Sequence, residues 1–205
     1  MELFRKIYYL VIAISFALFF NCVQAQTNET ENKLLSSRDK STIAIAVLTA
    51  KGDLVQLKSK LIGGLEAGLT INEIKEIVVH TYAYCGFPRS IRGLQTFMEV
   101  LEERKSKGII DQLGNEATKV INEEDKYNRG KSILQKLTNA TIPNTLSGYA
   151  AFAPIIDIFL KEHLFADIFE RDVLSFIQRE WVTISVISTI GEAEPMLKSH
   201  LLICL

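Results

Sequence analysis

Apolar residues recur at helical spacing along most of the chain, and polar or glycine-containing segments separate the apolar stretches. Residues 41–50 (STIAIAVLTA) are apolar nearly all round, which predicts a buried helix. A strand is the competing interpretation, because several of these residues are β-branched. A second helix, closed by Gly68, is predicted by leucines that follow at helical spacing: Leu54, Leu57, Leu61 and Leu65. With no convincing strand pattern, these features predict an all-α fold.

A capping box formed by Thr70 and Glu73 predicts the start of a third helix. This helix should end near Tyr84, because the Gly-Phe-Pro sequence at 86–88 contains a residue that cannot donate a backbone hydrogen bond. Ser90 is expected to cap the next helix, whose inward-facing residues are Leu94, Phe97, Met98 and Leu101.

An internal repeat is present. The sequences LKSKLIGGL (57–65) and LKSHLLICL (197–205) match at five of nine positions. An Arg-acid-x-x-Thr-Ile sequence precedes each copy, beginning at Arg38 and at Arg179. We therefore expect a tandem organisation in which the second repeat is incomplete. Its parts are a first repeat at 36–108, a linker with a short helix at 109–148, and a second repeat at 149–205.

Residues 1–25 have the pattern of a secretory signal peptide. Two basic residues precede an apolar run of about 14 residues, and Val23 and Ala25 offer a cleavage site before Gln26. An uncleaved membrane anchor and a lipoprotein through Cys22 are the alternatives. After cleavage we expect a flexible arm at 26–35 and no stable membrane association.

Composition excludes some classes of function. The net charge of −1 gives no electrostatic basis for binding nucleic acid. The three histidines are scattered without a second ligand at metal-binding spacing, so no metal and no other cofactor is expected. Cys85 and Cys204 form neither a CxxC pair nor a metal cluster.

One string of residues runs through Glu76, His80, Tyr84, Gly86 and Pro88, in a helix that follows the Leu-rich helix and the capping box. This string resembles the carboxymuconolactone decarboxylase family of the alkylhydroperoxidase D-like superfamily. The resemblance covers residues 36–105 well and 150–205 partly. It implies a tandem alkylhydroperoxidase D-like helical bundle that forms a homo-oligomer. It also implies a periplasmic or secreted protein of a Gram-negative bacterium.

The family resemblance implies two chemistries. One is decarboxylation of a γ-lactone, a lyase reaction. The other is a peroxiredoxin-like activity, in which a CxxC pair and a histidine react with the help of a nearby glutamate. Here Pro88 stands where the second cysteine would follow Cys85, so the second chemistry needs a resolving thiol from outside the chain. A non-catalytic helical oligomerisation module is a third possibility.

Glu76 and His80 lie four residues apart on one predicted helix, so their side chains can share a hydrogen bond. A carboxylate there would fix the imidazole tautomer and raise its pKa, which suits proton transfer on a small lactone or carbonyl acid. We therefore predict His80 as the acid/base, Glu76 as its orienter and Cys85 as a residue lining the pocket. The alternatives are a solvated helix face with an incidental ion pair and a small buried thiol. The candidate substrate-binding residues are Glu73, Tyr84 and His200.

Overall fold

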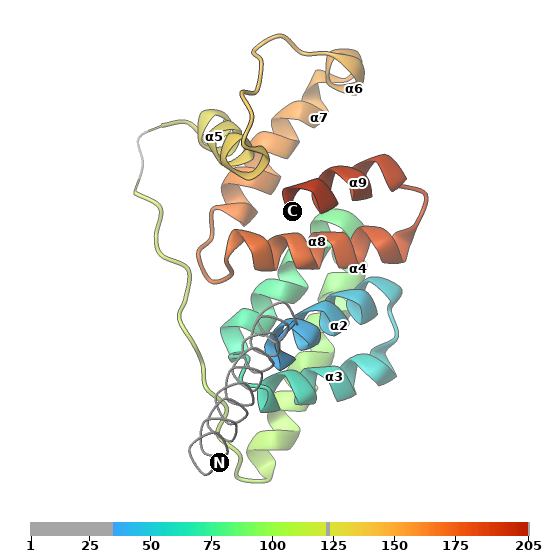
Figure 1. Cartoon of the computed structure of the whole chain (residues 1–205). Coiled ribbons are helices and arrows are strands. Elements are labelled where there is room, and N and C mark those ends of the chain that lie inside the picture. Colours follow the sequence, from blue (N-terminus) through green and yellow to red (C-terminus); the bar gives the residue numbers. More distant parts are fainter. Residues whose placement is uncertain (1–34, 122–123, 205) are drawn as a thin grey trace, which may run out of the picture. The chain divides into compact units, whose positions relative to one another are not determined.

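Regular structure is entirely helical in the computed structural model, which describes residues 35–121 and 124–204 (Figure 1). The predicted signal peptide, and the predicted arm except for Leu35, lie outside the described residues. The all-α prediction is confirmed. The helices are α2 Ser37–Lys51, α3 Leu54–Glu66, α4 Ile71–Ser106, α5 Lys126–Thr138, α6 Gly148–Phe152, α7 Pro154–Ile158, the π-helix η1 Phe159–Phe169, α8 Phe176–Ile190 and α9 Glu194–Ile203.

Helix α2 is the centre of the main core. It packs against α3, α4 and α8, and its residues Ile45 and Ala46 are completely buried. A helix with neighbours on three sides needs apolar residues on most of its surface, which explains why residues 41–50 show no polar face. The strand interpretation of this stretch is wrong.

Helix α4 begins at the predicted capping box. The Thr70 hydroxyl accepts a hydrogen bond from the Glu73 backbone N–H at 3.2 Å, and the Glu73 carboxylate accepts one from the Thr70 N–H at 2.8 Å. The first-turn N–H groups of Ile71 and Asn72 donate to backbone carbonyls of Gln112 and Leu113, both at 2.9 Å. The irregular segment 109–121, which we call the strap, therefore satisfies donors that a helix N-terminus leaves open.

The Gly-Phe-Pro sequence kinks α4 but does not end it. Gly86 has φ 80° and ψ 161°, and the helix resumes with Pro88 in the first turn beyond the kink, where a missing N–H is tolerated. The expected cap at Ser90 is wrong: its hydroxyl donates across the kink to the Val78 carbonyl at 2.8 Å. Met98, expected to face inward, has 61% of its surface exposed.

Helices α5 and η1 form a second packed layer. Gly130 on α5 lies so close to η1 that a Cβ there would stand 1.7 Å from the Lys161 carbonyl oxygen. The Lys161 side chain is buried and donates to both Asp157 oxygens and to the Tyr127 hydroxyl. This layer presents Phe169 towards α4, where it becomes part of the candidate site.

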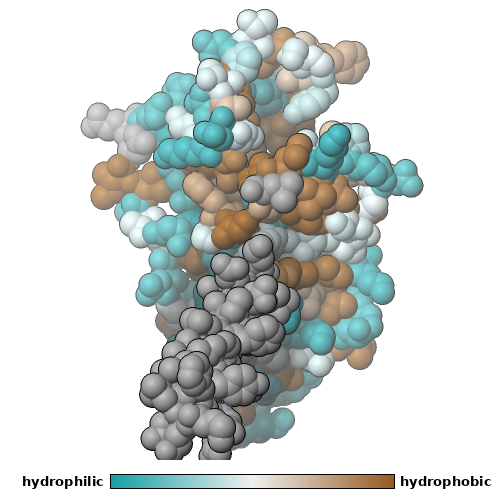
Figure 2. Space-filling model, viewed as in Figure 1, coloured by the Kyte–Doolittle hydropathy of each residue, from teal (hydrophilic) through white to brown (hydrophobic). Residues whose placement is uncertain are grey.

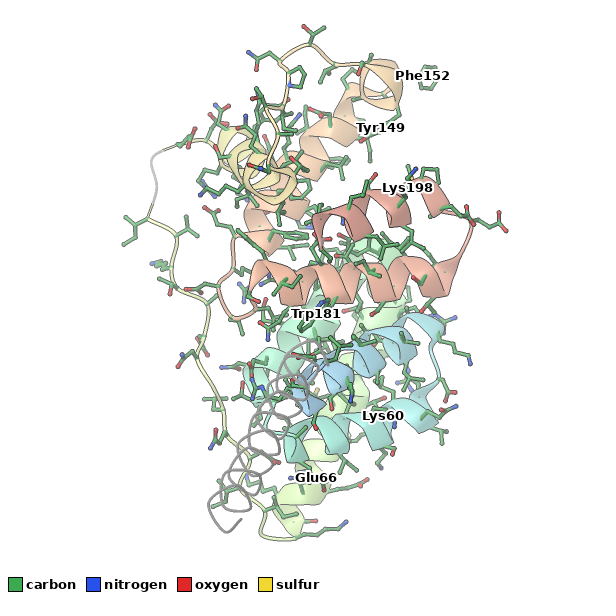
Figure 3. The ribbon with its side chains drawn as sticks, in the orientation of Figure 1. Lys60, Glu66, Tyr149, Phe152, Trp181 and Lys198 are labelled. Carbon is green, nitrogen blue, oxygen red and sulfur yellow. The ribbon has the colours of Figure 1, made fainter. Side chains whose placement is uncertain are left out.

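Some large apolar side chains are exposed. Tyr149 and Phe152 project from α6, and Phe152 has 92% of its surface in solvent (Figure 3). Apolar residues also gather across the middle of the face shown in Figure 2, at the level of α8 and α9 in Figure 1.

Helix α8 joins the two parts of the repeat by packing against both α2 and α4. It begins at its own capping box, formed by Ser175 and Gln178. The pairs α2–α3 and α8–α9 are each connected by a short turn with a glycine at positive φ, Gly52 in the first and Gly191 in the second. The packing of α8 on α4 brings the second copy of the Arg-acid-x-x-Thr sequence, beginning at Arg179, against the face that carries Glu76 and His80.

Candidate functional site

Glu76 is a buried carboxylate held by two arginines. Only 5% of its surface is exposed. Its Oε1 accepts a hydrogen bond from Arg171 Nε at 2.8 Å and a second from Nη2 of the same side chain. Its Oε2 accepts one from Arg179 Nη2 at 3.0 Å. The two oxygens therefore have different partners, one on the loop before α8 and one on α8 itself.

Arg179 is completely buried at the centre of this network. It donates to Glu76, to the Arg171 backbone carbonyl and, at 3.3 Å, to His80 Nδ1. Burial lowers the pKa of its guanidinium, and the hydrogen bond and charge of Glu76 act in the opposite direction. A buried guanidinium needs such a counter-charge, so Glu76 and Arg179 form one unit.

The geometry fixes the tautomer of His80, which is itself completely buried. An arginine can only donate, so the Nδ1 atom beside Arg179 must be the acceptor. The ring proton is then on Nε2, which donates to the Thr183 hydroxyl at 2.9 Å. Thr183 in turn donates to the Tyr84 hydroxyl at 3.1 Å. His80 is thus a neutral imidazole with both nitrogens engaged.

The environment of His80 differs from the sequence prediction. Burial lowers its pKa well below the usual value, and the charges of Arg179 and His200 lower it further. The expected rise through Glu76 is wrong, because both carboxylate oxygens of Glu76 face arginines and Arg179 lies between the two residues. The imidazole ring packs edge-on against Phe169, with ring centroids 5.0 Å apart.

Tyr84 and His200 lie on the side of His80 that faces α9. Burial raises the pKa of the Tyr84 hydroxyl, so this group stays protonated. The His200 ring is edge-on to Tyr84, and its Nδ1 lies 2.7 Å from Glu180 Oε2. Glu180 has 1% of its surface exposed, and its Oε1 has no hydrogen-bond partner among the described residues.

A cavity of about 350 Å³ opens beside this network. Its polar lining residues are Asn72, Lys75, Glu76, Glu116 and Arg171. Glu76 is therefore the member of the buried network that the cavity reaches, whereas His80 lies behind it. The strap contributes Glu116, so this segment both caps α4 and forms one wall of the cavity.

Two predicted site residues lie elsewhere. The Cys85 thiol is half-buried and donates to the Thr81 carbonyl at 3.1 Å, and burial raises its pKa. Its side chain packs against the main core, and Cys85 is not among the residues lining the cavity. Glu73 belongs to the capping box and forms an ion pair with Arg38 at 2.5 Å. Both residues therefore have contacts within the fold, and neither lines the cavity.

Sequence reasoning missed Arg171, Thr183 and Lys75, and it used Arg179 only as the start of the second repeat sequence. The internal repeat was the available signal, since it places Arg179 and Thr183 at corresponding positions of a second Arg-acid-x-x-Thr sequence. No comparable pattern marks Arg171, which lies on the loop between η1 and α8.

Within residues 35–121 and 124–204, no three His, Cys, Asp or Glu side chains are grouped closely enough to hold a metal ion. In the same ranges, no helix is both long and apolar enough to cross a membrane.

Comparison with known protein families agrees with the sequence motif that runs from Glu76 to Pro88. Residues 17–97 match the model of the carboxymuconolactone decarboxylase family, which confirms the resemblance. The match includes Glu76 and His80 but not Arg179. It also begins before residue 36, inside the predicted signal peptide. A search of curated proteins returned no match.

Proposed function

We propose that this chain, whose residues 17–97 match the carboxymuconolactone decarboxylase family, catalyses proton transfer on a small acid that carries a carbonyl or lactone group. A cavity of about 350 Å³ is within the range that holds small molecules. Lys75 and Arg171 in its lining provide positive charge for an anionic substrate.

One observation carries the proposal: Glu76 is a nearly buried carboxylate at the wall of a cavity, fixed from behind by a fully buried arginine. A carboxylate in this position can accept a proton from the carbon next to a carbonyl group and return it. While the proton is on Glu76, the electron pair of the broken C–H bond lies on the carbonyl oxygen. Lys75, a cation in the cavity lining, stabilises that oxygen.

The proposed roles of Glu76 and His80 are thus exchanged relative to the sequence hypothesis. Glu76 meets the substrate, and His80 is a positioning residue that acts through Arg179. His80 is suited to this role because its neutral form accepts from Arg179 at one nitrogen and donates to Thr183 at the other. Any proton added to Nδ1 would remove the acceptor that faces the guanidinium.

The experiment is exchange of solvent deuterium into small 2-oxo acids and carboxylated γ-lactones, followed by proton NMR. The wild-type chain should promote exchange, and Glu76→Gln should abolish it. The matched control is Glu102→Gln, at an exposed position on the same helix. Absence of exchange with the whole panel, or full activity in Glu76→Gln, would contradict the proposal.

The positioning role of His80 needs a separate comparison. His80→Gln keeps one acceptor and one donor and should lower kcat while leaving KM nearly unchanged. The control is His163→Gln, because His163 is half-exposed and contacts Asp167 on its own helix and the Tyr82 ring, both outside the Glu76 network. Equal effects of the two substitutions would remove His80 from the mechanism.

A further inference from the structure

The two oxygens of Glu76 differ in how firmly their partners are held. Arg179, which binds Oε2, has no exposed surface and is also tied to the Arg171 carbonyl. Arg171, which binds Oε1, has 44% of its side chain in solvent. One oxygen is therefore fixed to the protein interior, and the other is covered by a side chain with room to move.

Arg171 is also positioned to leave Glu76 for a ligand. It lies on the loop between η1 and α8 and lines the same cavity as Glu76. Both of its hydrogen bonds go to Oε1, so a single side-chain rotation releases that oxygen completely. Arg179 would stay in place and keep the carboxylate charge compensated.

Because of the charges in the cavity, an anion can bind there only if a cation leaves a glutamate and turns towards it. Lys75 and Arg171 are balanced by Glu76 and Glu116 in the lining. An entering carboxylate is repelled by the two glutamates unless a cation turns towards it. Arginine binds a carboxylate through two parallel hydrogen bonds, whereas lysine acts as a point charge. Lys75 Nζ donates to Asn72 Oδ1, one turn earlier on α4, at 3.2 Å.

We propose that Arg171 is the carboxylate-recognition residue of this cavity, and that it exchanges Glu76 Oε1 for the carboxylate of the bound acid. This rests on the proposed function, because the exchange uncovers the oxygen that accepts the substrate proton. In the absence of substrate, the ion pair with Arg171 occupies Oε1 of Glu76, so this oxygen is not free to accept a proton. A negatively charged acid displaces Arg171 from Oε1 by binding to it, whereas a neutral carbonyl compound does not.

Binding is tested with 4-oxopentanoate and its neutral methyl ester by isothermal titration calorimetry. Wild-type protein should bind the anion about tenfold or more tightly than the ester, the usual scale for a charge-assisted bidentate contact. Arg171→Gln should remove this preference, and Arg171→Lys should restore only part of it. Arg92→Gln, at an exposed position on α4, is the matched control and should bind as wild type does.

Kinetics separate recognition from a merely structural role. In Arg171→Gln the base is permanently uncovered, so KM should rise about tenfold while kcat at saturation stays close to wild type. A fall in kcat with unchanged KM would overturn the inference. So would wild-type affinity for 4-oxopentanoate in Arg171→Gln, or no binding by the wild type. Charge-selective binding that needs Arg171 but gives no deuterium exchange would support the recognition site and contradict the proposed proton transfer.

Discussion

Arg179 on α8 donates a hydrogen bond to His80 Nδ1 on α4, across 99 residues of sequence, and so determines which nitrogen of the imidazole carries the proton. The sequence pattern assigned this task to Glu76, one helical turn away from His80. The guanidinium contributes a positive charge where a carboxylate would contribute a negative one. Burial lowers the pKa of His80, and the charge of Arg179 lowers it further; the prediction of pH-dependent stability below follows from that direction.

The stability of the protein should fall as the pH drops below about 6.5, the usual pKa of an unfolded histidine. The pKa of His80 in the folded state is lowered, mainly by burial, so the unfolded chain binds a proton that the folded chain does not. The free energy of unfolding then loses up to about 1.4 kcal/mol per pH unit through this one group. Urea unfolding at pH 7.5 and 5.5 measures the difference.

In His80→Gln this pH dependence should be smaller, whereas His163→Gln should behave as wild type. A wild-type chain and a His80→Gln variant with the same change in unfolding free energy between the two pH values would contradict the buried, neutral state of His80.

Removal of the Arg179 guanidinium should destabilise the protein strongly. Arg179→Met leaves the Glu76 carboxylate buried with only the half-exposed Arg171 as a partner. Loss of one member of a buried ion pair costs about 3–5 kcal/mol, because the other charge remains uncompensated. Urea unfolding at pH 7.5 checks this, with the exposed Arg92→Met expected within about 0.5 kcal/mol of wild type. The double variant Glu76→Leu with Arg179→Met should recover part of the loss; no recovery would mean that the two charges are not coupled.

The first three described helices could be predicted because their signals are local. The leucines of α3, the apolar α2 and the capping box at Thr70 each depend on neighbours within a few residues. The kink at Gly86 was predicted to be a helix end, since the Gly-Phe-Pro sequence at 86–88 is compatible with both a kink and a helix end. The outcome depends on whether Ser90 finds an acceptor such as the Val78 carbonyl across the bend.

The candidate site could be predicted only on the α4 side. Glu76 and His80 stood out by spacing, but the partners that determine their chemistry lie 95 to 103 residues away. Arg171 and Arg179 reach them through the packing of α8 on α4. The spacing of residues within one helix does not indicate which other helix packs against it. The π-helix η1 was also missed, because a search for the 3.6-residue period of an α-helix does not detect its wider turn.

Two glycine substitutions should have opposite effects on stability. In Gly130→Ala the new Cβ would lie 1.7 Å from the Lys161 backbone oxygen, so α5 and η1 would have to separate. We expect destabilisation of about 1–3 kcal/mol, the usual cost of overpacking. Gly63 on α3 has nothing within 4 Å of an added Cβ, and Gly63→Ala should stabilise by about 0.5–1 kcal/mol. Thermal and urea unfolding of both variants provide the comparison, and a neutral Gly130→Ala would contradict the close approach of α5 to η1.

The predicted export can be tested on the expressed protein. If residues 1–25 act as a signal peptide, the chain recovered from the periplasm of a Gram-negative host should begin at Gln26. Intact-mass spectrometry measures this directly. The family match begins at residue 17, inside the predicted signal peptide. A mature protein that retains residues 17–25 would therefore contradict cleavage before Gln26. Substitution of Ala25 by a large residue should block cleavage and provides the control for the predicted site.

Cys85 should prove dispensable for peroxide chemistry. Its pKa is raised by burial, so less of the reactive thiolate is present at neutral pH than in an exposed cysteine. The thiol also donates to the Thr81 carbonyl, which holds the proton on sulfur. We expect Cys85→Ser to consume hydroperoxide no more slowly than wild type when an external thiol is supplied, and to retain deuterium exchange. Cys204→Ser is the matched control, since Cys204 is the other free cysteine among the described residues and burial raises its pKa as well. Loss of hydroperoxide consumption in Cys85→Ser alone would contradict this expectation and support the peroxiredoxin-like alternative.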